Sequence, residues 1–265
     1  MSRISVNQLR SVSVSETLTS GEGIVDLWYY LYEGIDAGLQ AAYEAILSPT
    51  ERRRYESLRF EPDRHLFLAT RALVRSVLSN YSAVSPADWR FALSDHGKPH
   101  ISSPAVTPAI HFNLANTPGL VACAVSVAHE LVGVDAERID REVEAVELAD
   151  RYFSKLEADR VRASPSSERL GRFFSYWTLK ESYLKARGLG LGLALNRMSF
   201  IVEDEIRVVF DRRLGDAATL WRFAVLDAPP HHAIAISVKT DGADLSLRSA
   251  QFVPPDRNAV SRGVS

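Results

Sequence analysis

The chain has 265 residues, 46% of them hydrophobic, so it can bury one large core or two smaller ones. Its net charge of −2 provides no general attraction to nucleic acid. No apolar run is long enough to span a membrane or to form the core of a signal peptide. The single cysteine, Cys123, cannot form an intrachain disulfide. We therefore expect a soluble cytoplasmic protein without nucleic-acid or membrane partners.

The first half of the chain predicts a strand, then helices, then short strands. Residues 1–23 lack a clear period and predict a loose extension. Ser48, followed by Pro49 and Glu51, is typical of a capped helix start. We expect strands at 24–32, 89–93, 110–114 and 120–127, and helices at 35–47, from residue 48, and at 62–81.

A second series begins at residue 131 and repeats this order. We expect a strand at 131–137, helices at 142–153, from Ser154 and at 172–188, and strands at 199–202, 206–210, 221–226 and 233–238. The repeat predicts an α+β fold of two similar α/β halves related by a pseudo-twofold, each with a small, mainly antiparallel sheet and packed helices. We assign 1–23 to a flexible extension, 24–128 and 129–240 to the halves, and 241–265 to a flexible tail.

The helix at 172–188 carries a carboxylate on its packing face. At 100° per residue, Phe173, Trp177 and Leu184 share an apolar stripe, Glu181 falls inside it, and Lys185 lies one turn further on. A surface ion pair between Glu181 and Lys185 is the ordinary alternative. The aromatic and aliphatic surroundings of Glu181 favour a site instead, because a buried carboxylate is costly unless it is paired or binds a metal.

Asp135 and Glu137 lie two residues apart on a predicted strand, so both point to one face. Spacing alone favours a solvated acidic strand end. With Glu181 nearby, the three carboxylates would form an oxygen-only ligand set that suits Mg²⁺, or Mn²⁺ in its place.

Basic side chains gather in the other half, at 52–54 and at Arg71, Arg75 and Lys98. The planar guanidinium group binds two phosphate oxygens at once. Acidic groups in one half and basic groups in the other predict a polyphosphorylated ligand in the cleft between them. The alternative, an exposed helix face, is favoured for Arg52 and Arg53 taken alone.

These motifs resemble those of one enzyme family. GVDAE at 133–137, followed about 40 residues later by WTLKESYLKARG at 177–188, is similar to the two signatures of the 4′-phosphopantetheinyl transferases of the Sfp type. GKP at 97–99 and HFNLANTPGLVACA at 111–124 match further segments in order. The resemblance covers about residues 24–238 and implies the two-half fold described above.

The resemblance also implies roles for individual side chains. Asp135, Glu137 and Glu181 would bind Mg²⁺ on the coenzyme A pyrophosphate. Lys185 would contact the pyrophosphate and assist the leaving group. Glu181 is in addition our candidate for the general base, acting directly or through water. The remaining contacts to coenzyme A, at its 3′-phosphate and adenosine end, would come from Lys98, Arg54, Arg71, Asn116 and Thr117.

Two positions depart from the family pattern. Asn116, in Ala115-Asn116-Thr117, stands where many relatives have a phosphate-contacting histidine, and asparagine carries no charge. Glu51 stands where some relatives have a basic residue, so Arg52 or Arg54 would have to replace it. Neither change affects the three carboxylates.

The resemblance implies a transferase with holo-[acyl-carrier-protein] synthase activity, and we expect a monomer because the two halves already supply both sides of the cleft. It would move 4′-phosphopantetheine from coenzyme A to a serine of an apo acyl or peptidyl carrier protein, in fatty acid, polyketide or nonribosomal peptide synthesis. Two alternatives remain open at this point: a Mg²⁺-dependent pyrophosphohydrolase acting on a nucleotide, and a non-catalytic paralogue that binds coenzyme A or a carrier.

Overall fold

The computed structural model describes residues 5–11, 23–190, 194–227 and 231–254. Its first half contains one strand, three helices and two pairs of strands. These elements are β2 (Ile24–Leu31), α1 (Ala37–Ala45), α2 (Pro49–Glu56), α3 (Glu61–Leu78), β3 (Arg90–Leu93), β4 (Pro99–Ser103), β5 (His111–Thr117) and β6 (Leu120–Ser126).

The second half repeats the same order of elements. It contains β7 (Val132–Arg138), α4 (Ala145–Tyr152), α5 (Lys155–Ala163), α6 (Ser166–Arg187), β8 (Met198–Val202), β9 (Ile206–Phe210), β10 (Trp221–Asp227) and β11 (His232–Lys239). The strand orders also correspond, because β2-β6-β5 in one sheet matches β7-β11-β10 in the other, with antiparallel pairing throughout. The expected α+β fold of two similar halves is confirmed.

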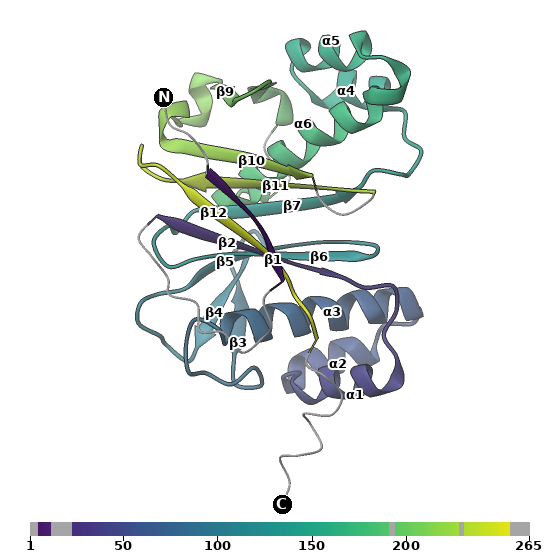
Figure 1. The fold of residues 1–265 in the computed structure, drawn as a ribbon, viewed down its shortest axis with the longest axis vertical. Helices are drawn as coiled ribbons and strands as arrows, with labels where there is room; N and C mark the ends of the chain where they lie inside the picture. Colours follow the sequence, from purple (N-terminus) through teal and green to yellow (C-terminus); the bar gives the residue numbers. More distant parts are fainter. Residues whose placement is uncertain (1–4, 12–22, 191–193, 228–230, 255–265) are drawn as a thin grey trace, which may run out of the picture.

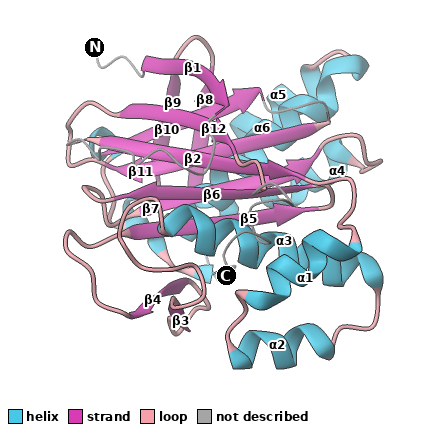
Figure 2. Cartoon of the chain, turned by 60° about the horizontal axis from the view of Figure 1, so that its bottom comes forward, coloured by secondary structure: helices cyan, strands magenta, loops and turns pink. Residues whose placement is uncertain are grey.

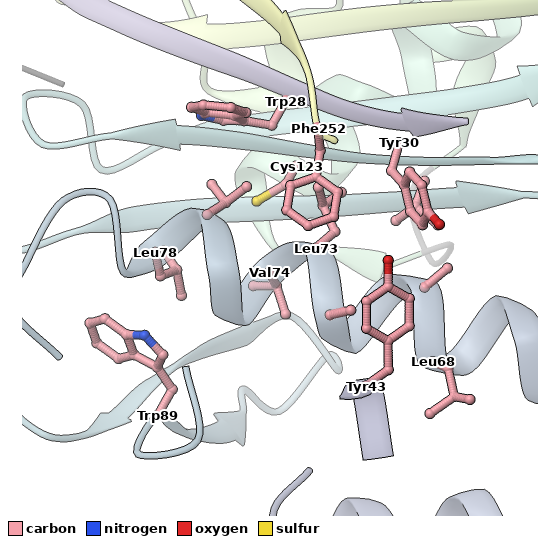
Figure 3. Packing of buried hydrophobic residues seen from close by; sticks show 14 of the residues in the cluster. Trp28, Tyr30, Tyr43, Leu68, Leu73, Val74, Leu78, Trp89, Cys123 and Phe252 are labelled. Atoms are coloured by element: carbon pink, nitrogen blue, oxygen red, sulfur yellow. The ribbon is translucent and has the colours of Figure 1, made fainter. Parts of the chain in front are cut away.

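The two sheets face each other and the helices lie outside them. Helices α1–α3 cover one side of the molecule and α4–α6 the other (Figure 1, Figure 2). Alternate residues of β2 therefore enter different cores. Trp28 and Tyr30 pack toward α3, as Figure 3 shows, whereas Leu27 contributes to the layer between the sheets, which also contains Val134 and Ile236.

Local sequence signals account for two of the helix starts. The hydroxyl oxygens of Ser48 and Ser154 each accept a hydrogen bond from the backbone N–H of a glutamate three residues on, and the side chain of that glutamate accepts one from the serine N–H. Both capping boxes are therefore confirmed. Helix α6 begins at Ser166, six residues before the predicted start. Among the described residues, no helix is long and apolar enough to cross a bilayer.

The C-terminal segment differs from the expected flexible tail. Strand β12 (Ser246–Gln251) lies between β2 and β1 (Ser5–Ser11) and is parallel to both. Leu247 and Phe252 are almost fully buried. The expectation of a mobile tail after residue 240 does not hold for residues 246–251, because so short a strand, set between β1 and β2, leaves little signal in hydrophobic periodicity. Residues 1–4, 12–22 and 255–265 of the two expected tails lie outside the described residues.

Candidate active site

The site begins with the close packing of α6 on β7. A Cβ atom on Gly133 would lie 2.0 Å from the backbone oxygen of Ser182 and 2.4 Å from the nitrogen of Ala186. Only glycine therefore lets the helix approach this strand so closely. Ser182 and Ser237 add a buried hydroxyl–hydroxyl hydrogen bond of 2.6 Å between α6 and β11.

This packing brings the predicted acidic and basic groups together. Asp135 and Glu137 share the face of β7 on which Gly133 meets α6. The Nζ atom of Lys185 donates a hydrogen bond of 2.6 Å to Oδ1 of Asp135. Asp135 and Glu181 are both buried, at 5% and 9% exposure. The surface ion pair considered between Glu181 and Lys185 is therefore not what forms, since Lys185 pairs with Asp135.

Burial and mutual repulsion perturb the carboxylates. The pKa of Glu181 is raised to about 7, first by desolvation and then by the charge of Asp135, while Lys185 lowers it. The pKa of Glu137 is also raised, first by desolvation and then by Asp135, although Arg141 lowers it. A cation placed among these groups would relieve the repulsion that raises both values.

The donor chemistry fits a divalent cation, although the ligands are not arranged as a finished metal site. No group of three acidic, histidine or cysteine side chains in the described ranges has metal-binding geometry. Lys185 occupies one oxygen of Asp135, and Arg141 donates a 2.9 Å bond to Glu137. However, Oδ2 of Asp135 and Oε1 of Glu181 are buried without a hydrogen-bond partner among the described residues. Two such oxygens suit Mg²⁺.

Lys98 reaches this site from the first half. Its Nζ atom donates to the backbone oxygens of Ala186 at 3.0 Å and Val132 at 3.3 Å. It lines a cavity of about 340 Å³ together with Glu181 and Lys185. Desolvation lowers the pKa of Lys98, an effect that Glu130 partly opposes. The turn between β3 and β4 is thus attached to the ends of β7 and α6.

The predicted arginine cluster is partly structural. Arg75 is fully buried. Its guanidinium group donates to Glu51 at 2.5 Å and to the backbone oxygen of Trp89 at 3.0 Å. The prediction that Arg75 belongs to a phosphate-binding strip is therefore wrong. Arg71 also faces Glu51, at 3.6 Å. Arg54 is exposed on α2, and neither Arg54 nor Arg71 lines the cavity of Lys98. The carboxylate of Glu51 pairs with Arg71 and Arg75, an interaction that the spacing of these residues did not predict.

Strand β5 contributes mainly through a residue that the sequence analysis did not select. Oδ1 of Asn113 accepts a 2.9 Å hydrogen bond from the N–H of Val134, and the amide also lines the Lys98 cavity. It therefore joins β5 of one half to β7 of the other. Asn116 is exposed and Thr117 is buried, and neither lines that cavity.

Lys180, which precedes Glu181 in the signature, has a structural partner. It forms a fully buried ion pair of 2.8 Å with Glu157 and also donates to the backbone oxygens of Leu195 and Met198. Desolvation lowers the pKa of Lys180 to about 8 against the opposing charge of Glu157. Glu157 closes the capping box of α5 and accepts from the N–H of Phe200, so this pair fixes α6 against α5 and β8.

A larger cavity, of about 790 Å³, lies between the halves near Tyr32, His65, Pro118 and His232. None of the predicted site residues lines it. The chemistry of the buried carboxylates therefore places the candidate site at the smaller cavity, where Glu181, Lys185 and Lys98 converge.

Comparisons with known proteins agree with the signatures. The family model of the 4′-phosphopantetheinyl transferase superfamily matches residues 131–237. A phosphopantetheinyl transferase of Thraustochytrium sp. is 31% identical over 218 residues, covering 77% of this chain and 74% of that protein. The transferase HetI of Nostoc sp. is 34% identical over 175 residues, covering 66% and 72%. The transferase Sfp of Bacillus subtilis is 28% identical over 194 residues, covering 73% and 83%.

A solved structure, the holo-[acyl-carrier-protein] synthase of Thermotoga maritima, matches 42% of this chain and 62% of that chain, with 18% identity and a TM-score of 0.34. The likeness is confined to part of the fold. The curated relatives, in contrast, match over most of both chains. By this extent of similarity, the chain belongs to the 4′-phosphopantetheinyl transferase superfamily.

Proposed function

We propose that this phosphopantetheinyl transferase moves the 4′-phosphopantetheine group of coenzyme A onto a serine hydroxyl of an apo acyl or peptidyl carrier protein. The serine oxygen forms a bond to the phosphorus that carries pantetheine. The bond from that phosphorus to the bridging oxygen breaks, and adenosine 3′,5′-bisphosphate leaves. The observation that carries the proposal is the juxtaposition of Asp135, Glu181 and Lys185 where α6 packs on β7.

Mg²⁺, or Mn²⁺ in its place, would be held by Asp135, Glu137 and Glu181. When bound, the ion neutralises charge on the pyrophosphate and on the departing bisphosphate. The support for these ligands is their oxygen-only chemistry and the two buried oxygens, on Asp135 and Glu181, that lack a partner in the described structure.

Glu181 is proposed as the general base for the incoming serine, acting directly or through one water. Without metal the pKa of Glu181 is about 7, and a bound cation would lower it, so the carboxylate would be ionised near neutral pH and able to accept the hydroxyl proton. Leu184 lines the same cavity as Glu181, and Glu181 is itself only 9% exposed, so bulk water reaches little of its side chain.

Lys185 is proposed to act on the leaving group. Its side chain is one-third exposed and lines the cavity, so its ammonium group can reach a pyrophosphate that enters there. It would stabilise the developing negative charge and provide a proton for the leaving phosphate.

At the adenosine and 3′-phosphate end, we propose Lys98 as the main contact, because it lines the same cavity as Glu181 and Lys185. Arg54, Arg71, Asn116 and Thr117 remain proposed contacts, and their participation requires a ligand that extends beyond this cavity toward α2 and the end of β5. We also propose a cytoplasmic monomer, since one chain supplies both sides of the site.

Intact-mass measurement tests the activity. The protein is incubated with coenzyme A, Mg²⁺ and a panel of apo acyl and peptidyl carriers, with and without chelator. We expect at least one carrier to gain one phosphopantetheine group, and the matched carrier with serine replaced by alanine to gain nothing. Cleavage of coenzyme A without a carrier would instead indicate a pyrophosphohydrolase, and no reaction with any carrier would contradict the proposal.

A further inference from the structure

The ion pair between Lys185 and Asp135 has a feature that the transfer reaction alone does not explain. Lys185 is the proposed partner of the pyrophosphate, yet its Nζ atom lies 2.6 Å from Oδ1 of Asp135, a proposed metal ligand. A divalent cation that binds the other oxygen of this carboxylate, Oδ2, would lie next to the ammonium group, and the two positive charges would repel each other strongly. The metal and Lys185 therefore compete for the negative charge of Asp135.

The surroundings show which group can leave. Asp135 is fixed in the middle of β7, with only 8% of its side chain exposed, whereas 33% of the Lys185 side chain is exposed and its flexible stem borders the cavity. Glu137 is held by Arg141 on the outer side, and Glu181 has one buried oxygen without a partner in the described structure. Lys185 is thus the more movable partner in its ion pair with Asp135.

We propose that Lys185 is an internal counter-ion of Asp135 which a divalent cation displaces, so that metal binding delivers the ammonium group to the cavity where the pyrophosphate enters. The inference rests on the proposed function for the identity of the metal ligands. It adds that the metal and Lys185 compete before coenzyme A binds and act together only afterwards. Without metal, Lys185 neutralises a buried carboxylate and is unavailable to the leaving group.

Metal binding in the absence of coenzyme A tests the competition. Mn²⁺ is titrated into the wild type, Lys185→Met and Lys185→Arg, and free Mn²⁺ is followed by electron paramagnetic resonance. We expect Lys185→Met to bind Mn²⁺ about tenfold more tightly than the wild type, because a competing positive charge is gone. Lys185→Arg should stay within about threefold. Lys155→Met, which removes an exposed lysine on α5, is the matched control and should not change binding.

A second measurement uses the wild type alone and so does not depend on the folding of a variant. The rate of acetylation of Lys185 by a mild amine reagent is measured by peptide mass spectrometry with and without Mg²⁺. A displaced ammonium group is more accessible, so we expect Mg²⁺ to raise this rate at least about threefold, with Lys155 unchanged as the internal reference.

The outcomes separate this inference from the proposed function. If transfer requires Mg²⁺ but Lys185→Met binds Mn²⁺ no more tightly than the control, or Mg²⁺ leaves the acetylation of Lys185 unchanged, the competition is wrong and the transferase assignment stands. If neither the wild type nor any variant binds Mn²⁺, with or without coenzyme A, both the competition and the proposed metal ligands are wrong.

Discussion

Each half of the molecule places a buried aspartate on its first strand, and the two differ in how completely they are paired. Asp26 of β2 receives two hydrogen bonds from Arg248, at 2.6 and 2.9 Å, and a third from the hydroxyl of Tyr81 at 2.6 Å. Asp135 of β7 receives one from Lys185, and its other oxygen has no partner in the described structure.

The contrast distinguishes a structural carboxylate from a chemical one within one repeated architecture. A fully paired buried charge stabilises one arrangement of its neighbours and has no capacity left for a ligand. A half-paired one is costly in the folded protein and gains most from an incoming cation. The same topology thus places a purely structural aspartate, Asp26, in the first half and a candidate site residue, Asp135, in the second.

The largest effect expected from this contrast is on activity. Asp135→Asn should lower the rate of transfer about a thousandfold, roughly 4 kcal/mol of transition-state stabilisation, because a proposed metal ligand loses its charge. Its free energy of unfolding should change by less than about 1 kcal/mol, since the lost bond to Lys185 is offset by the removal of a buried charge. Transfer kinetics and urea unfolding measure the two quantities.

Asp26→Asn is the matched variant in the other half. It should lower the free energy of unfolding by about 2 kcal/mol, less than for a fully buried pair because Arg248 is partly exposed. The turnover of the folded enzyme should be unchanged. A large loss of turnover in this variant, or near-normal transfer by Asp135→Asn, would remove the distinction between the two aspartates.

Two neighbouring lysines of α6 sharpen the same comparison. Lys180→Met should lower the free energy of unfolding by about 3 kcal/mol, because it leaves Glu157 charged and unpaired in a fully buried position. Lys185→Met should lower it much less and reduce transfer much more. Urea unfolding of both variants measures these losses. The double variant Lys180→Met/Glu157→Gln should recover part of the stability lost in Lys180→Met, because it also removes the charge of Glu157. Equal stability losses at the two positions would show that Lys185 is also structural.

The perturbed carboxylate gives a pH effect of about 2 kcal/mol. Below about pH 4.5, Glu181 is protonated in both the folded and unfolded chains and contributes no difference. Between about 4.5 and 7 the unfolded chain releases this proton while the folded one keeps it, so stability falls as pH rises, and the cost is complete above about 7. Solvent in the cavity screens part of this charge, which keeps the cost at about 2 kcal/mol.

Glu181→Gln should therefore be more stable than the wild type at pH 8 in chelator, and equally stable near pH 4.5. Thermal unfolding at several pH values measures the difference between the two proteins, which cancels the contributions of other titrating groups. A wild type that is as stable as Glu181→Gln at pH 8 without metal would show that the pKa of Glu181 is not raised.

The smallest expected effect concerns the first half. Lys98→Ala should raise KM for coenzyme A about tenfold, or roughly 1.4 kcal/mol, and change KM for dephospho-coenzyme A less, because that substrate lacks the 3′-phosphate. Steady-state kinetics with both substrates checks this. If KM rises equally for both, Lys98 acts by attaching the β3–β4 turn to α6 through its bonds to Ala186 and Val132.

Short-range signals in the sequence predicted much of this structure. The capping boxes at Ser48 and Ser154 involve groups three residues apart, so the sequence alone predicts them. The resemblance to the family implied that Asp135, Glu181 and Lys185 lie together, but the ion pair between Asp135 and Lys185 was not predicted. Roles for Asn116, Thr117 and Arg54 stay predictions.

The features that could not be predicted depend on contacts between distant segments. The burial of Arg75 requires Glu51 and Trp89, which reach it from other elements. Gly133 has no conformational signature, and its importance appears only when α6 lies against it. The pairing of Arg248 with Asp26 joins positions 222 residues apart, so nothing in the local pattern of either segment indicates it.

The position of β12 affects the order in which the two halves can fold during synthesis. Synthesis proceeds from the N-terminus, and domains usually fold as they emerge from the ribosome. Here the sheet of the first half contains a strand from residues 246–251, set between β1 and β2. The half that is translated first is therefore completed last. Until those residues emerge, Asp26 lacks its guanidinium partner and the edge of β2 is open to pairing with other chains.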